Sequence, residues 1–140
     1  MTIRTTFLAL AVTLVLAAPA VAATKHGVTP IAPKANASVP AGQSPTFRFR
    51  AKGGGTAWVH VCASRKRNSD GIICNKAMIG QAKRSNGVYK FKPEFFDFPE
   101  FWLNTPGTYY WQAHRIKCEG SIRDCRQEGP IIKFKVAPAG

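Results

Sequence analysis

Acidic residues are scarce in this sequence of 140 residues. Seven Asp and Glu stand against 20 Lys and Arg, and the formal net charge is +13. Such a balance favours anionic partners, for example nucleic acid, acidic polysaccharide, teichoic-type polymers or anionic lipid. Solubility is the competing explanation, because net charge bears on association and not on fold. The composition therefore indicates the sign of a partner but not its identity.

Catalytic and cofactor motifs are also missing. The sequence has no recognisable pair of nucleophile and base, and no set of metal ligands. These are the features by which an enzyme site is recognised. No internal repeat is present either. We therefore expect a protein that is not an enzyme and that binds no cofactor.

Only one long apolar run occurs, and it lies at the N-terminus. Phe7–Leu16 is apolar apart from Thr13, Arg4 precedes it, and small residues fill Ala18–Ala23. This pattern predicts a secretory signal peptide over residues 1–23. The alternative, a membrane anchor, would need a longer run. We expect a secreted protein, extracellular or in the cell envelope, with no membrane span. Only one of the 20 cations lies in the leader, so the rest keeps 19 against seven acids.

Cysteine is limited to four residues, all beyond the leader: Cys62, Cys74, Cys118 and Cys125. An even number in an exported chain predicts two disulfides. Neither neighbouring pair has the close spacing of common zinc sites, and no cysteine is left over as a nucleophile. Three pairings are possible, and we favour the two local ones, Cys62–Cys74 and Cys118–Cys125.

Helical periodicity is absent beyond the leader, and alternation of apolar and polar residues takes its place. In Pro106–Ile116, Tyr109 and Trp111 alternate with Tyr110 and Gln112, as in a strand with one face on a core. We expect the first pair to be buried in the core and the second not. The other predicted strands are 45–51, 57–63, one or two short ones at 72–74 and 78–79, 88–92 and 130–136. Phe47, Phe49 and Ala51 should point inward, as should Ile132, Phe134 and Val136.

Three segments resemble strands of a known family. Pro45–Ala51, Leu103–Trp111 and Gly129–Val136 are similar to the second, sixth and seventh strands of fibronectin type III-like domains of exported bacterial proteins. The stretch from Leu103 through Pro-Gly-Thr to Tyr109 resembles the tyrosine corner of that family.

The resemblance implies an all-β fold, a single immunoglobulin-like sandwich of about seven strands over residues 45–138. A Pro- and Ala-rich lead-in, residues 24–44, would precede it and contain an edge strand. The family is a scaffold for binding or spacing, so the resemblance implies no catalytic residues. The chain departs from the family in its four cysteines and in the long insert Phe95–Trp102.

In such a sandwich the third, sixth and seventh strands share one sheet. Its outer side would carry aromatic and cationic residues, which we call the candidate binding face: Trp58, His60, Tyr110, Gln112, His114, Lys133 and Lys135. Aromatics mixed with cations on an open sheet suit bases, sugars and phosphates. The alternative is an ordinary solvated face. His60 and His114 have matching parity, but two ligands are too few for a metal site, and we expect surface histidines.

Two loops are further candidates. Arg65, Lys66 and Arg67 form a basic loop that would contact phosphate or polysaccharide, or would simply be solvated. In Glu94–Trp102 five aromatic residues surround three carboxylates. We expect the aromatic residues to plug the open end of the sandwich. A loop that binds peptide or sugar is the alternative, and paired acids for glycoside hydrolysis are the least favoured interpretation.

The sequence therefore supports two functions. The first is a secreted, basic, non-enzymatic binding module for an anionic envelope or extracellular component or for a protein partner. The second is a structural or accessory extracellular domain without a dedicated ligand. An ordered aromatic and basic face would favour the first, whereas a face broken by local ion pairs with acids would favour the second. We expect a monomer and no specific recognition of nucleic acid.

Overall fold

The segments in which apolar and polar residues alternate form strands in the computed structural model of this chain. It describes residues 24–53, 55–63, 78–94, 103–116 and 126–140, and these contain no helix. The nine strands are β1 (Val28–Ala32), β2 (Ser38–Pro40), β3 (Phe47–Ala51), β4 (Thr56–Cys62), β5 (Met78–Ser85), β6 (Val88–Phe91), β7 (Gly107–Ile116), β8 (Arg126–Glu128) and β9 (Ile132–Ala137). The predicted all-β class is confirmed.

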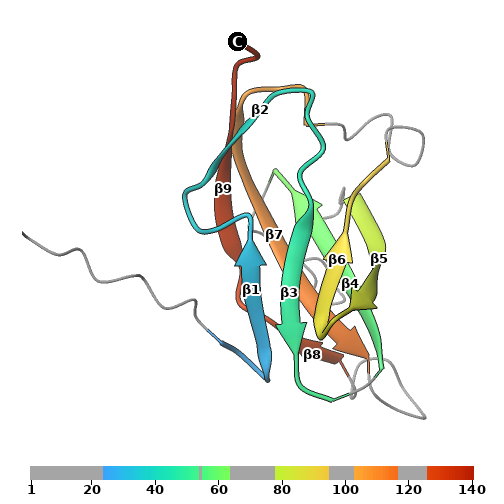
Figure 1. Cartoon of the computed structure of the whole chain (residues 1–140). Helices are drawn as coiled ribbons and strands as arrows, with labels where there is room; N and C mark the ends of the chain where they lie inside the picture. Colours follow the sequence, from blue (N-terminus) through green and yellow to red (C-terminus); the bar gives the residue numbers. More distant parts are fainter. Residues whose placement is uncertain (1–23, 54, 64–77, 95–102, 117–125) are drawn as a thin grey trace, which may run out of the picture.

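The strands form one curled sheet in the order β1-β3-β6-β5-β4-β7-β9-β2, with β8 added to the end of β7. Pairing is antiparallel except between β2 and β9, which run parallel. Strand β5 makes the bend, because Met78–Ala82 pairs with β4 and Lys83–Ser85 pairs with β6. The half with β1, β3 and β6 consequently lies in front of the half with β4, β7 and β9 in Figure 1.

Aromatic rings fill the space between the two halves of the sheet. The ring of Phe47 in β3 lies 5.5 Å from Trp111 in β7 and 6.0 Å from Phe134 in β9, measured between centroids. Phe49 stacks on Tyr89 at 5.2 Å. All five of these side chains are buried, and edge-to-face and stacked pairs add to the free energy gained from burial.

The inward parity predicted for strands β3 and β9 is confirmed. Phe47, Phe49 and Ala51 are buried. In β9, Phe134 and Val136 are buried, and Ile132 packs against the core while partly exposed.

The lead-in supplies both edges of the sheet. Strand β1 pairs with β3 at one end of the strand order, and β2 pairs with β9 at the other. Residues 24–44 thus contain two edge strands, where one was expected. Trp111 Nε1 donates a hydrogen bond to the carbonyl oxygen of Pro33 between them, at 3.0 Å. The buried indole is thus satisfied by the lead-in itself.

A hydrogen bond stabilises the turn before β7. The hydroxyl of Tyr109 donates to the carbonyl oxygen of Thr105, four residues upstream, at 3.0 Å. Leu103, at the start of the turn, is buried against the core. Tyr109 is partly buried and packs on the same core, and its ring lies 5.9 Å from Phe134.

Two strands differ from the prediction. Strand β5 extends to Ser85, whereas the sequence predicted a strand only at 78–79. The prediction was too short because Gly80 has no side chain and residues 83–85 are polar, so the apolar alternation stops at residue 79. A Cβ at Gly80 would lie 1.9 Å from Cε2 of Phe91, so the ring occupies the place of a side chain. Strand β8 was not predicted, since its sequence Arg-Gln-Glu has no apolar alternation. The segment 72–74 lies outside the described residues.

No helix within the described ranges has both the length and the hydropathy needed to cross a membrane. The predicted signal peptide, residues 1–23, lies outside these ranges and stays a prediction.

Candidate functional site

Strands β4, β7 and β9 are neighbours, as predicted, and they bring the candidate binding face together. Across β4 and β7, Trp58 pairs with His114 and His60 with Gln112. Across β7 and β9, Tyr110 pairs with Lys133. Side chains paired in this way project from the same side of a sheet. All seven residues of the candidate binding face therefore share one side of this half of the sheet.

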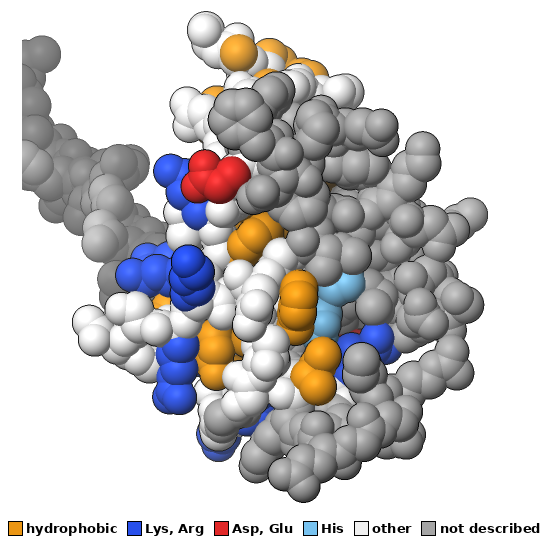
Figure 2. All heavy atoms as spheres, turned by 90° about the vertical axis from the view of Figure 1, so that its right-hand side faces the viewer, with side chains coloured by type: hydrophobic (Ala, Val, Ile, Leu, Met, Phe, Trp, Pro, Cys, Tyr) orange, Lys and Arg blue, Asp and Glu red, His pale blue; other side chains and the backbone are white. Residues whose placement is uncertain are grey.

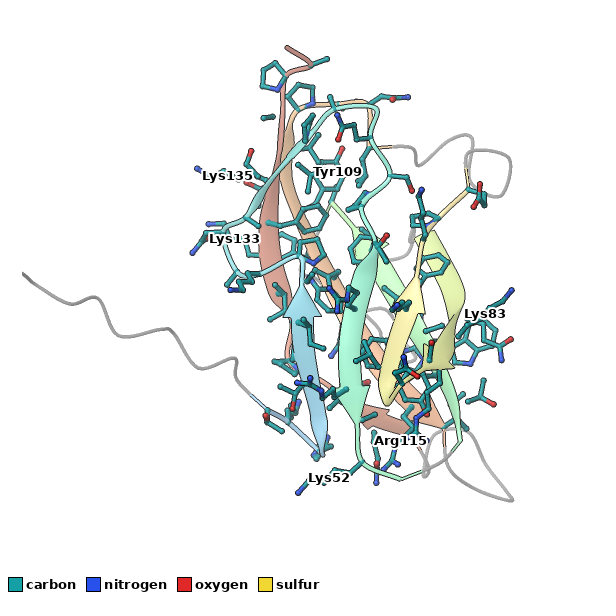
Figure 3. All side chains as sticks on the ribbon, viewed as in Figure 1. Lys52, Lys83, Tyr109, Arg115, Lys133 and Lys135 are labelled. Carbon is teal, nitrogen blue, oxygen red and sulfur yellow. The ribbon has the colours of Figure 1, made fainter. Side chains whose placement is uncertain are left out.

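That face is largely covered. His60, Gln112 and His114 are only 3%, 2% and 6% exposed. Trp58 and Tyr110 are half-buried, and only Lys133 and Lys135 are exposed, projecting from β9 in Figure 3. The expectation of surface histidines is thus wrong, and so is that of an open sheet at these positions. Gln112 is outside the core, as predicted, but it is buried.

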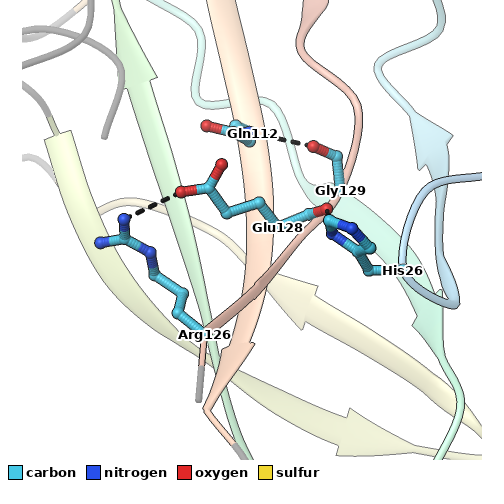
Figure 4. Close-up of polar contacts among 5 residues, drawn as sticks. All are labelled: His26, Gln112, Arg126, Glu128 and Gly129. Carbon is cyan, nitrogen blue, oxygen red and sulfur yellow. Dashed lines mark hydrogen bonds and ion pairs between the residues drawn. The ribbon is translucent and has the colours of Figure 1, made fainter. Parts of the chain in front are cut away.

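Strand β8 and the residue that follows it help to explain the covering. Gln112 Nε2 donates to the carbonyl oxygen of Gly129 at 2.9 Å, and His26 Nδ1 donates to that of Glu128 at 3.2 Å (Figure 4). Arg126 and Glu128 form an ion pair of 2.9 Å over this side of β7. These two hydrogen bonds connect the segment Glu128–Gly129 to β7 and to the lead-in. The face therefore contains a local ion pair with an acid, the feature expected of a structural surface.

The two buried histidines touch each other. Their ring centroids are 4.5 Å apart. Burial lowers the pKa of His60 to about 4, helped by Arg126 and opposed by Glu128. Burial also lowers the pKa of His114 to about 3, helped by the charge of His60 and then of Arg126. Both imidazoles are therefore neutral at neutral pH.

Two buried ring nitrogens, Nδ1 of His60 and Nε1 of Trp58, find no hydrogen-bond partner within the part of the chain that the structure describes. Neutral imidazoles are metal ligands, but a closed site needs three or four of them. Among the described residues, no three His, Cys, Asp or Glu side chains lie close enough to hold a metal ion.

A second surface gathers cations, on the outer side of β3, β6 and β5. We call it the cationic face and define it as Arg48, Arg50, Lys52, Lys83, Lys90 and Lys92. All six side chains are exposed. The prediction that Arg48, Arg50 and Lys52 point outward is confirmed. In Figure 2, Lys and Arg side chains gather along the left-hand border, which corresponds to the front of Figure 1.

The register places like charges directly opposite each other. Arg48 on β3 pairs with Lys90 on β6, and Lys90 pairs in turn with Lys83 on β5. Strands are about 4.8 Å apart, so three cations form a row across the sheet. Like charges at opposed positions destabilise a sheet.

The two described acidic residues form no ion pair with this row. The described part of the chain contains two acids, of which Glu128 pairs with Arg126 on the other half of the sheet. Glu94 is exposed and follows the end of β6. Within the described residues, no ion pair joins an acid to a cation of the cationic face. By contrast, the guanidinium of the neighbouring Arg84 lies over the ring of Tyr89, 5.7 Å from its centroid.

Several predicted sites fall outside the described residues. These are the basic loop Arg65, Lys66 and Arg67, the insert Phe95–Trp102, and three of the four cysteines, Cys74, Cys118 and Cys125. Cys62 is described and is buried beside Tyr110 and Ile131. Both local disulfides therefore stay predictions.

Sequence reasoning found half of the cationic face and missed the rest. Alternation in β3 identified the outward cations, and the same alternation in Val88–Phe91 marks Lys90 as outward. The missing information was that β6 lies beside β3.

Comparison with known proteins adds no family. No family model matches the sequence, and no curated protein matches it.

Proposed function

We propose that this protein is an exported, basic, non-enzymatic binding module, and that its cationic face holds an anionic polymer of the cell envelope or the extracellular space. The observation that carries this proposal is the row Arg48–Lys90–Lys83, three exposed cations in direct register that pair with no acid among the described residues.

The electrostatic cost of the row supports a binding role. Interspersed charges of both signs are sufficient to keep a protein soluble. Here, in contrast, cations on adjacent strands lie opposite each other and repel each other in the free protein. An anionic chain across the row would replace that repulsion by attraction and would release counterions. The free energy lost in the free protein is then recovered on binding.

We also propose that the curled sheet is an immunoglobulin-like sandwich of the fibronectin type III kind. The hydrogen bond from Tyr109 to Thr105 supports this, since it has the position and direction of a tyrosine corner. The strand order, with β1, β3 and β6 facing β4, β7 and β9, is consistent with it. Fold alone carries no function, so the binding proposal stands on the cationic face.

The proposal is tested by measuring binding of the protein to a panel of polyanions at low and high salt. We expect binding at about 0.05 M salt that weakens steeply by about 0.5 M, because each phosphate contact contributes about 0.7 to the slope of the logarithmic salt dependence for a single-stranded polyanion. Failure to bind any member of the panel at low salt would instead support the accessory domain, which the ion pair Arg126–Glu128 on the other face favours.

A further inference from the structure

The cations of the cationic face are spaced differently in its two directions. Along β3, Arg48 and Arg50 alternate with inward residues, and Lys52 just beyond the end of the strand continues the pattern, so successive cations are two residues apart. Two residues of a strand span about 6.7 Å. Across the strands, from Arg48 to Lys90, the separation is about 4.8 Å. A linear polyanion that follows the strands therefore meets one cation about every 6.7 Å.

A particular class of polymer has this repeat. Six covalent bonds join the Cα atoms of residues two apart. Six bonds also join neighbouring phosphorus atoms when phosphates are linked through three carbons and two ester oxygens. Two extended residues reach at most about 7 Å, and a chain of six comparable single bonds reaches about as far. Consecutive phosphates of such a chain can thus meet Arg48, Arg50 and Lys52 in turn.

The residue types suit phosphate. Arginine binds phosphate oxygens through two parallel N–H groups, and lysine binds them as a point charge. Lys90 on β6 and Lys92 just beyond its end prolong the path past Arg48, because β3 and β6 are antiparallel and only Lys90 lies directly opposite a cation, Arg48. A chain lying between the two strands would therefore meet, in turn, Lys92, the opposed pair Lys90 and Arg48, Arg50 and Lys52.

Nucleobases, in contrast, find no platform on this face. Proteins that hold single strands combine a cationic path with exposed aromatic side chains on which bases stack. The aromatic residues of β3 and β6, which are Phe47, Phe49, Tyr89 and Phe91, all point inward and are buried. The described part of the cationic face offers charge and no stacking surface.

We infer that the cationic face binds a linear polyol-phosphate chain, with phosphates linked through three carbons, extended along β3 and β6. The inference rests on the proposed function and narrows its ligand from any polyanion to this one.

The test compares four polymers at equal concentration of charge: poly(glycerol phosphate), oligothymidylate with the same six-bond repeat plus bases, inorganic polyphosphate with closer charges, and a sulfated polysaccharide. Affinities are measured by titration at several salt concentrations. We expect poly(glycerol phosphate) to bind about ten-fold more tightly than polyphosphate or the polysaccharide, and oligothymidylate to gain nothing from its bases.

Two matched variants locate the site. Lys90→Gln with Lys92→Gln removes two charges from the cationic face. Lys133→Gln with Lys135→Gln removes two charges with the same spacing from β9, on the other half of the sheet. We expect the first variant to bind poly(glycerol phosphate) about ten-fold more weakly and to lose about 1.4 from the salt slope, at about 0.7 per contact. The second should stay within about two-fold of the parent.

The outcomes separate the inference from the proposed function. Equal affinity per charge for all four polymers would overturn the inference and leave the function intact. Tighter binding of oligothymidylate than of poly(glycerol phosphate) would show that bases are recognised, and would also overturn it. Equal losses in the two variants would mean that the site is elsewhere. Binding to none of the polymers would remove both proposals. Matching circular dichroism spectra of the parent and both variants verify that the substitutions leave the fold intact.

Discussion

At the scale of single residues, Trp111 is the largest side chain that β7 places in the core. It is fully buried, it packs on Phe47, and its indole N–H is bonded to Pro33. Trp111→Ala should therefore lower the free energy of unfolding by about 3–5 kcal/mol. The half-buried Tyr110 faces the other side, and Tyr110→Ala should cost much less. Urea titration of both variants checks this order, and equal losses would contradict the register.

The buried histidine pair predicts acid sensitivity. His60 and His114 have a lowered pKa, about 4 and about 3, because of burial, whereas an unfolded histidine has an ordinary value of about 6.5. The unfolded chain thus binds more protons below pH 6.5. The free energy of unfolding therefore has its full value above pH 6.5, where both histidines are neutral in either state, and it decreases as the pH falls toward 4.

The loss is measurable by urea unfolding at pH 7.5, 6 and 5. Each histidine should lower the free energy of unfolding by up to about 1.4 kcal/mol for each unit by which the pH falls below 6.5 within this window. Most carboxylates remain ionised there, so the histidines dominate the slope. The variant His60→Gln with His114→Gln, if it folds, should show a flatter dependence on pH. A parent protein whose stability is constant between pH 7 and 5 would contradict the burial of the pair.

Residue burial could be predicted from the sequence only where alternation reports it. Phe47 and Phe134 follow a period of two and were assigned to the core correctly. Gln112 and His114 lie on the opposite side, and alternation alone predicts that such residues are exposed. Their burial involves contacts with Gly129 and Glu128, which are distant in sequence and carry no apolar signal.

At the scale of the strand, Gly80 makes β5 possible. The ring of Phe91 fills the position that its side chain would take. Gly80→Ala should therefore displace that ring, and overpacking of this kind costs about 1–3 kcal/mol. Thermal unfolding of the variant measures the loss. The exposed Gly87 is not a suitable control because of its positive φ, whereas Gln81→Ala changes the next, exposed position of β5. An unaffected Gly80→Ala variant would contradict the packing of β5 on β6.

The same glycine explains why β5 was predicted too short. Strand signals depend on apolar or β-branched residues at every second position. Here Gly80 and Ala82 occupy the inward positions, and a ring from another strand supplies the bulk. Such a strand forms because of its contacts with neighbouring strands, and its own sequence contains few of the residues that predict a strand.

At the scale of the whole molecule, unbalanced charge should make stability depend on salt. The cationic face places Arg48, Lys90 and Lys83 in one row, and among the described residues no acid pairs with them. Screening lengths fall from about 30 Å at 0.01 M salt to about 10 Å at 0.1 M. The unfolding temperature should therefore rise when sodium chloride is added at low ionic strength.

Lys90→Gln with Lys92→Gln supplies the control for this effect. It should raise stability at low salt, since opposed like charges cost about 0.2–1 kcal/mol per pair, and should reduce the salt dependence. Lys133→Gln with Lys135→Gln removes as much charge without touching the row. An unfolding temperature that falls with added salt would contradict the account.

The neighbourhood of the row could not have been predicted from alternation. Outward cations can be identified within one strand, but which strands lie side by side is a property of the whole sheet. The pair Arg48–Lys90 joins segments separated by strands β4 and β5, and no local pattern encodes that distance. The all-β class and the outward cations of β3 were predictable, whereas the row across β3, β6 and β5 was not.

The pairing of β2 with β9 also sets the order of events in synthesis. The ribosome delivers Ser38–Pro40 long before their partners in the sheet, Lys135–Ala137. A nascent chain therefore carries an edge strand without its partner until that second segment has emerged. This edge of the sheet forms only when both segments are free to pair, which leaves the polypeptide open to a chaperone or a translocase in the meantime.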